Sequence, residues 1–146
     1  MSVNNNLVVM TRSLLIWLFL ILAPPQAFAA DPTGSGMELL MVEEEGCMWC
    51  ARWNRQIGPI YEKTSEGQRA PLRRIDKNAA LPPTITTARG FFFTPTFILL
   101  VDGAEKGRIE GYPGEDFFWG LLAQMITSVD KATSANSERQ HDNNSR

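Results

Sequence analysis

The stretch MELLMVEEEGCMWC, residues 37–50, decides the fold. It opens with an apolar run over 37–42, which is long enough for a strand and is bounded by polar residues. Three acids and a glycine follow over 43–46, and then come Cys47 and Cys50. Beyond Cys50 the apolar residues recur with helical spacing, so we expect the cysteines to open a helix directly after a strand.

The two cysteines lie three positions apart, which brings their side chains close together on the first turn of a helix. Such a pair can interconvert between dithiol and disulfide with little backbone movement. The free N–H groups and positive dipole end of a helix N-terminus also stabilise a thiolate. We therefore expect Cys47 to be the exposed nucleophile and Cys50 to be the resolving thiol that attacks a mixed disulfide.

Other roles for the cysteine pair must be weighed. A zinc site needs further ligands, but there is no third cysteine and the only histidine is His141, far along the chain. A purely structural disulfide would close a short loop and stabilise little through loop entropy. Copper(I) is the sharper competitor, because Cys47, Cys50 and Met48 supply the soft sulfur ligands that this ion prefers. We therefore favour thiol–disulfide exchange as the role of the cysteine pair. A copper(I) carrier or a redox-regulated adaptor is the alternative.

The first helix is expected to be interrupted. Its apolar stripe consists of Trp49, Trp53, Ile57 and Ile60. Gly58-Pro59 falls inside this stripe and should kink it, because proline removes a backbone donor and clashes with the preceding turn. A loop over 64–71 then leads to the next strand.

Three more strands are expected, at 72–75, 96–101 and 107–110. The unbroken apolar run 96–101 suits a central strand buried on both faces, and Asp102-Gly103 after it is a hairpin signal. Phe118, Leu121, Leu122 and Met125 then form the stripe of a helix that should end near Ser128. The element order predicts an α/β fold with a minimal mixed four-stranded sheet flanked by helices.

The two ends of the chain differ from this domain. An apolar run over 14–23, preceded by Arg12 and followed by Ala27-Phe28-Ala29, is typical of a secretory signal peptide over 1–29. An uncleaved membrane anchor is the weaker alternative, since a span needs about 20 apolar residues. A Pro/Gly/Ser linker over 30–36 precedes the domain at 37–128, and residues 129–146 are expected to be a disordered polar tail. We therefore expect a protein that is exported from a bacterial-type cytoplasm.

Composition limits the classes of partner. With 146 residues, a formal net charge of -2 and a mean hydropathy of -0.15, the chain fits one compact domain and is not a multi-span membrane protein. It lacks the basic excess of a nucleic-acid binder, so no nucleic-acid partner is expected.

Residues beyond the cysteines extend the pattern to a known family. Gly46 to Cys50, Thr94-Pro95 before the strand 96–101, Asp102-Gly103 and the run 111–119 together resemble a periplasmic thioredoxin-fold protein over about residues 37–128. Within that family the chain most resembles the thioredoxin encoded with bacterial sulfur-oxidation systems. The resemblance implies that Thr94-Pro95 is a cis peptide bond facing the dithiol and positions the substrate chain. It also implies a periplasmic location and a membrane thiol-electron donor. We expect a monomer with no cofactor beyond the redox-active disulfide of Cys47 and Cys50.

The chain also departs from the family pattern. Met-Trp stands between the cysteines, and Met41 occupies the place of the family's buried acid on the first strand. Glu43 or Glu44 is a candidate substitute for that acid. The run 43–45 should also disfavour the thiolate of Cys47, which would make the dithiol a better reductant. We therefore expect an enzyme that reduces disulfides in exported proteins.

Aromatic residues near the cysteines have two interpretations. Trp49 either faces the substrate or packs in the core with Trp53. The run Phe91-Phe92-Phe93 either lines a substrate groove or, as is more common beside a sheet, belongs to the core.

Overall fold

A computed structural model describes residues 36–145 of the chain. The predicted signal peptide over 1–29 and the linker over 30–36, apart from Gly36, lie outside the described residues. Within 36–145, no helix combines the length and the apolar character that crossing a membrane requires.

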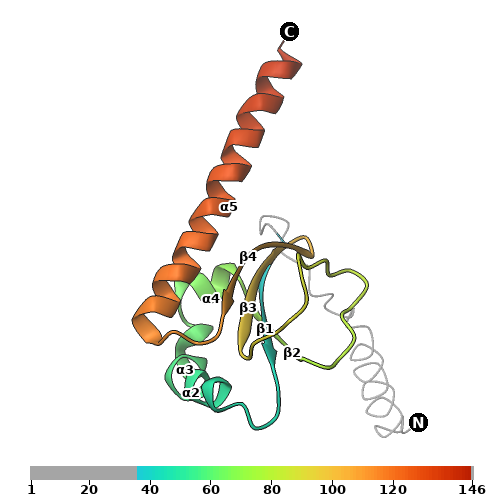
Figure 1. Cartoon of the computed structure of the whole chain (residues 1–146). Coiled ribbons are helices and arrows are strands. Elements are labelled where there is room, and N and C mark those ends of the chain that lie inside the picture. The colour runs from blue at the N-terminus through green and yellow to red at the C-terminus, as the bar shows by residue number, and fades with distance from the viewer. Residues whose placement is uncertain (1–35, 146) are drawn as a thin grey trace, which may run out of the picture. The chain divides into compact units, whose positions relative to one another are not determined.

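The centre of the domain is one four-stranded mixed sheet (Figure 1). Its strands are β1 (Met37–Glu43), β2 (Leu72–Asp76), β3 (Thr96–Val101) and β4 (Ala104–Glu110), in the spatial order β2-β1-β3-β4. The pair β1–β2 is parallel, whereas β1–β3 and β3–β4 are antiparallel. The predicted α/β class, the four strands and the Asp102-Gly103 hairpin are confirmed. β1 and β3 are the two inner strands. The residues at the ends of these strands therefore lie at the centre of an edge of the sheet.

One face of the sheet is covered by helices. These are α2 (Met48–Gln56), α3 (Gly58–Tyr61), α4 (Ser65–Arg69) and α5 (Glu115–Asn144). Buried side chains of α2, α3 and α5 join Leu39, Met41, Phe97 and Leu99 of the sheet in one apolar cluster that includes Trp53, Tyr61 and Phe118. Burial of each large apolar side chain contributes about 1.5–3 kcal/mol, so this cluster supplies the main stabilisation of the domain.

Two local predictions concern the helices on this face: a break at Gly58-Pro59 and a loop over 64–71. The break at Gly58-Pro59 is confirmed, since α2 ends at Gln56 and α3 starts at Gly58. The predicted loop over 64–71 contains the short helix α4 instead. Thr64 caps it, because its hydroxyl oxygen accepts a hydrogen bond from the N–H of Gly67 over 3.1 Å.

The opposite face of the sheet is covered by residues 77–95, which contain no helix or named strand and are called here the covering segment. Leu40, Val42, Ile98 and Leu100 form a second apolar cluster with its side chains Leu81, Ile85 and Phe91. Helices therefore flank one face of the sheet, and the covering segment packs on the other. Pro82-Pro83 is the local reason, because consecutive prolines cannot donate the backbone hydrogen bonds of a helix.

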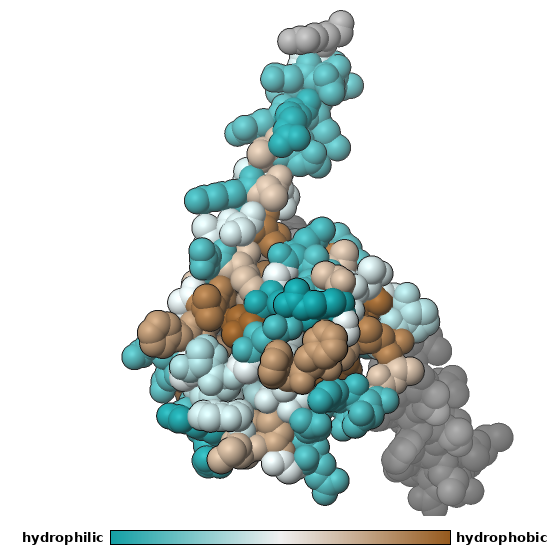
Figure 2. All heavy atoms as spheres, viewed as in Figure 1, coloured by the Kyte–Doolittle hydropathy of each residue, from teal (hydrophilic) through white to brown (hydrophobic). Residues whose placement is uncertain are grey.

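The last helix is longer than expected. The sequence predicts an end near Ser128 and a disordered tail over 129–146, whereas α5 continues to Asn144. Val129 still packs against the core, and Arg69 of α4 forms an ion pair with Asp130 at 2.5 Å. No glycine or proline occurs after Gly120, so nothing in the chain breaks the helix. Figure 2 shows the surface of this extension as mostly hydrophilic, which is why apolar periodicity did not reveal it.

Candidate active site

Cys47 and Cys50 form a disulfide at the start of α2, with their Cα atoms 5.3 Å apart. Cys47 is the N-cap of the helix and has extended backbone angles. Its Sγ atom accepts a hydrogen bond from the backbone N–H of Cys50 over 3.0 Å. The sequence prediction of a cysteine pair opening a helix is therefore met, and the sulfur of Cys47 lies where helix N–H groups can stabilise negative charge.

The two cysteines differ in exposure. Cys47 is half-buried, whereas Cys50 is 4% exposed and belongs to the helix-side core. A turn between β1 and α2 precedes the pair, in which the N–H of Cys47 donates to the carbonyl of Glu44 over 3.3 Å. Gly46 has a φ of 76°, a left-handed conformation that glycine adopts at little cost. An incoming disulfide can therefore approach Cys47 far more readily than Cys50.

An open groove of about 490 Å³ lies beside the start of α2. Its lining comes from α2, the end of the covering segment and the chain between β4 and α5: Trp49, Phe93, Thr94, Glu110, Gly111, Tyr112 and Pro113. Burial raises the pKa of Tyr112, and the carboxylate of Glu115 adds to this shift. Its hydroxyl donates a hydrogen bond to Oε1 of Gln56 over 3.0 Å. Trp49, two residues after Cys47, brings this groove to the start of α2, and a substrate-binding role for the groove stays a prediction.

The Thr94-Pro95 bond is cis, as the family resemblance implies. Pro95 is buried, and its carbonyl accepts a hydrogen bond from the N–H of Gly111 over 2.8 Å. Thr94 is half-buried and lines the groove together with Trp49. The structure thus brings Thr94 to the neighbourhood of the dithiol, and a substrate-positioning role for Thr94 and Pro95 stays a prediction.

The acids before Cys47 have specific partners. Arg74 donates to both carboxylate oxygens of Glu43, over 3.0 and 2.9 Å. Glu44 accepts a hydrogen bond from the hydroxyl of Thr94, and its Oε2 lies 3.7 Å from Nζ of Lys77. Glu45 is exposed. Their cationic partners offset much of the negative charge beside Cys47. That Glu43 and Glu44 modulate the thiolate of Cys47 therefore stays a prediction.

The aromatic residues near the site are more exposed than core packing would require. Trp49 is 46% exposed, and the guanidinium of Arg52 lies 5.6 Å from its ring centroid. Phe92 and Phe93 are 68% and 60% exposed, so the core interpretation of these two residues is wrong. Phe91 alone packs against the second apolar cluster. Hydrophobicity predicted burial for all three phenylalanines, but the irregular backbone of the covering segment turns only the first toward the sheet.

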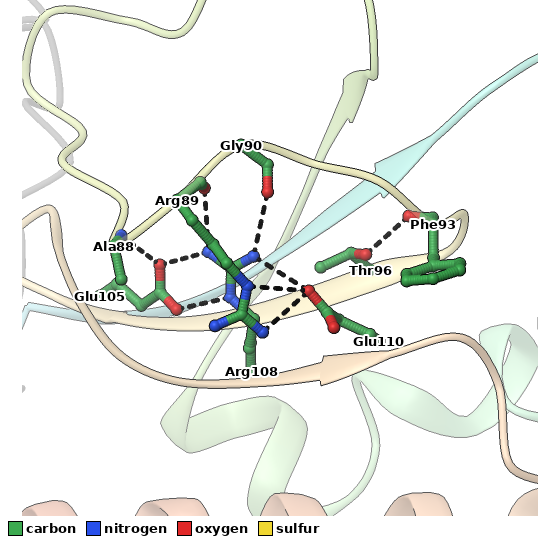
Figure 3. Close-up of polar contacts among 8 residues, drawn as sticks. All are labelled: Ala88, Arg89, Gly90, Phe93, Thr96, Glu105, Arg108 and Glu110. Atoms are coloured by element: carbon green, nitrogen blue, oxygen red, sulfur yellow. Dashed lines mark hydrogen bonds and ion pairs between the residues drawn. The ribbon is translucent and has the colours of Figure 1, made fainter.

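A buried ion cluster that sequence reasoning missed holds the covering segment on β4 (Figure 3). The Arg108 side chain is 7% exposed and lies 2.7 Å from the carboxylate of Glu105 and 3.3 Å from that of Glu110. It also donates to the carbonyls of Arg89 and Gly90, over 3.1 and 3.2 Å. The cluster therefore fixes the backbone just before the three phenylalanines.

Met48 is 73% exposed. Among residues 36–145, no group of three or more His, Cys, Asp or Glu side chains is placed to hold a metal ion. Within the described residues, no such group supplies a further ligand for a copper(I) ion bound by the sulfur atoms of Cys47, Cys50 and Met48.

The comparison with solved structures decides the family. The chain is similar to the crystal structure of the periplasmic thioredoxin SoxS from Paracoccus pantotrophus in its reduced form, with 49% sequence identity and a TM-score of 0.63. The match covers 64% of this chain and 98% of that chain. The chain belongs to the thioredoxin family. Its Cys47–Cys50 disulfide accordingly makes it a thiol–disulfide oxidoreductase. The resemblance to thioredoxins, and among them to the sulfur-oxidation thioredoxin, is confirmed.

A second thioredoxin is also similar, Mala s 13 from Malassezia sympodialis, with 16% identity and a TM-score of 0.42 over 63% of this chain and 76% of that one. No family model matches the sequence, and no curated protein matches it. The assignment of the chain to the thioredoxin family thus depends on its similarity to the Paracoccus protein.

Proposed function

We propose that this thioredoxin is a periplasmic reductase of disulfides in exported partner proteins. The observation that carries the proposal is the unequal exposure of the two cysteines beside an open groove: Cys47 is accessible and Cys50 is 4% exposed. The similar Paracoccus protein is described as a periplasmic thioredoxin, which supports the compartment. A reductase is needed there because exported proteins meet an oxidising environment.

The reaction follows from the positions of the sulfurs. In the reduced enzyme, the Cys47 thiolate attacks one sulfur of the partner disulfide, and the other partner sulfur leaves as a thiolate that takes up a proton. Cys50 then loses its proton and attacks Sγ of Cys47, which releases the second partner thiolate. Two electrons pass to the partner, and the enzyme ends with the Cys47–Cys50 disulfide. A membrane thiol-electron donor would return the enzyme to its dithiol form, and the enzyme would work as a monomer with no further cofactor.

A trapping experiment tests the proposal. The Cys50→Ser variant cannot resolve a mixed disulfide, so Cys47 should hold its natural partner covalently in the periplasm. We expect an adduct that dithiothreitol releases and mass spectrometry identifies as an exported protein. The matched Cys47→Ser variant should form none. Equal adducts from both variants, or none from either, would contradict the assigned roles.

A copper(I) titration separates the remaining alternative. Reduced protein that takes up one copper(I) tightly at the dithiol, and shows negligible disulfide exchange, would replace the reductase with a metal carrier. Active exchange with weak copper(I) binding would support the reductase.

A further inference from the structure

We propose that Glu44 is a positioning residue for disulfide exchange, and that it acts by connecting the turn before Cys47 to Thr94 at the substrate groove. This inference rests on the exchange reaction proposed above. It concerns a contact between two loops that are 50 residues apart in sequence.

The strand registers place Glu44 at this point. In β1, Val42 is paired with Thr96 of β3 in antiparallel register, and Glu43 is paired with Asp76 of β2 in parallel register. Extending the antiparallel register beyond the end of β1 brings Glu44 opposite Thr94. Extending the parallel register by one residue brings it beside Lys77. Because β1 lies between β2 and β3, the residue after its end has a neighbour on each side.

All three oxygen atoms of Glu44 have partners. Its Oε1 accepts the hydroxyl hydrogen of Thr94, its Oε2 lies 3.7 Å from Nζ of Lys77, and its backbone carbonyl accepts from the N–H of Cys47 over 3.3 Å. The hydrogen bond from Thr94 goes to a charged acceptor, which makes it stronger than one between neutral groups. One residue thus connects the backbone that carries the nucleophile to the side chain that lines the groove.

The geometry of sulfur attack gives this connection a catalytic consequence. Cys47 must meet a partner sulfur held in the groove that Thr94 and Trp49 line. A small displacement of a reacting group can lower the reaction rate by a large factor, because the rate depends on holding the reacting atoms close together in the right orientation. By fixing the Cys47 turn relative to Thr94, Glu44 lowers the cost of aligning a bound protein disulfide.

Glu44 therefore differs from the buried acid of the family. Met41, which is fully buried on β1, occupies that acid's position, while the Glu44 side chain is 38% exposed. Glu44 acts through Thr94 and not by contact with the sulfurs.

The test compares two substrates of different size. Reduced wild-type protein and Glu44→Ala are reacted with insulin, whose disulfide needs alignment in the groove, and with 2,2′-dithiodipyridine, which is small and uncharged. We expect the rate constant for insulin to fall about tenfold in Glu44→Ala, as loss of one strong hydrogen bond allows, while the rate for the small disulfide is unchanged. Glu45→Ala removes the same charge from an exposed neighbour, and should leave the ratio of the two rates unchanged because a change in the thiolate acts on both substrates alike.

Variants of the hydrogen-bond partner complete the test. Thr94→Val should reproduce the loss, Thr94→Ser and Glu44→Gln should largely restore the rate, and the double variant Glu44→Ala/Thr94→Val should be no slower than either single one. If Glu44→Ala does not fold, Thr94→Val against Thr94→Ser decides the question. Wild-type insulin rates in Glu44→Ala, or an equal loss with both disulfides, would overturn the proposal. Failure of wild-type protein to reduce insulin would overturn the proposed function as well, so the two failures are distinguishable.

Discussion

The Sγ atom of Cys47 accepts a hydrogen bond from the backbone N–H of Cys50 over 3.0 Å. This N–H is one of the donors at the start of α2 that have no acceptor within the helix. After reduction the same donor faces the sulfur of Cys47, whereas Cys50 lies one turn further on and is buried.

Alkylation should therefore distinguish the two thiols. We expect iodoacetamide to modify Cys47 before Cys50 in reduced protein at a pH of about 6–7, because only the thiolate reacts and the helix N-terminus favours it at Cys47. Peptide mass spectrometry after short exposure measures both sites. Unfolded reduced protein is the control and should show similar rates. Equal or reversed rates in the folded protein would remove the role assigned to Cys47.

The redox potential tests the direction of electron flow. Thioredoxin and the strong periplasmic oxidant differ by about 150 mV, and about 30 mV corresponds to a tenfold change in equilibrium constant. We expect this protein to lie nearer the thioredoxin value, at about -270 mV, in equilibrium with a dithiothreitol redox buffer. A potential above about -150 mV, together with protein that is oxidised in the cell, would favour an oxidase or isomerase.

Two glycine substitutions should change stability in opposite directions. A Cβ atom on Gly67 would lie 1.9 Å from the carbonyl oxygen of Tyr61, so Gly67→Ala must displace backbone and should cost about 1–3 kcal/mol. At the exposed Gly120 of α5 a Cβ atom meets nothing within 4 Å. Gly120→Ala should therefore stabilise by about 0.5–1 kcal/mol, because alanine favours a helix. Urea unfolding of both variants checks the pair, and equal shifts would contradict the packing around Gly67.

Removal of Arg108 should be far more damaging than removal of its neighbour Arg89. Arg108→Leu leaves the carboxylate of Glu105, which is 9% exposed, without its main partner, and should cost about 3–5 kcal/mol. Arg89 is 54% exposed and pairs with Glu110 at the surface, so Arg89→Leu should cost less than about 1 kcal/mol. Thermal and urea unfolding measure both. Similar small losses would show that the covering segment does not depend on the buried cluster.

Glu105 should make stability depend on pH. Burial by itself would raise the pKa of Glu105, but hydrogen bonds from Arg108 and from the N–H of Ala88, with the charges of Arg108 and Arg89, lower it overall. A lowered pKa in the folded state contributes stability above the ordinary glutamate pKa, and this contribution is lost as the pH falls through the folded value. The difference in unfolding free energy between wild type and Glu105→Gln should shrink as pH falls from 7 to about 3. A difference independent of pH would contradict the ion pair.

Much of the fold could be predicted because its signals are local. The apolar runs 37–42 and 96–101 gave the two inner strands, Asp102-Gly103 gave the hairpin, and the spacing of Cys47 and Cys50 gave the start of α2. Each signal depends on the period of a strand or helix or on the backbone angles of a turn, and so it can be recognised without knowing what packs against it.

The extension of α5 shows the limit of apolar periodicity. Beyond Val129 the helix buries almost nothing, and its continuation is explained by the absence of helix breakers together with the Arg69–Asp130 ion pair. The pairing partner lies 61 positions earlier in the chain, so the sequence of the helix does not reveal it.

The sequence by itself determined the sheet, the helix that carries the dithiol and the chemistry of the two sulfurs. Tertiary structure alone decided what surrounds them. An irregularity in β4 between the partners of Leu99 and Leu100 brings Glu105 and Arg108 to one face, although strict alternation would separate residues three apart. The registers of three strands bring Glu44 between Thr94 and Lys77. Such contacts depend on how strands pair across the sheet, and pairing is a property of the whole domain and not of any one segment.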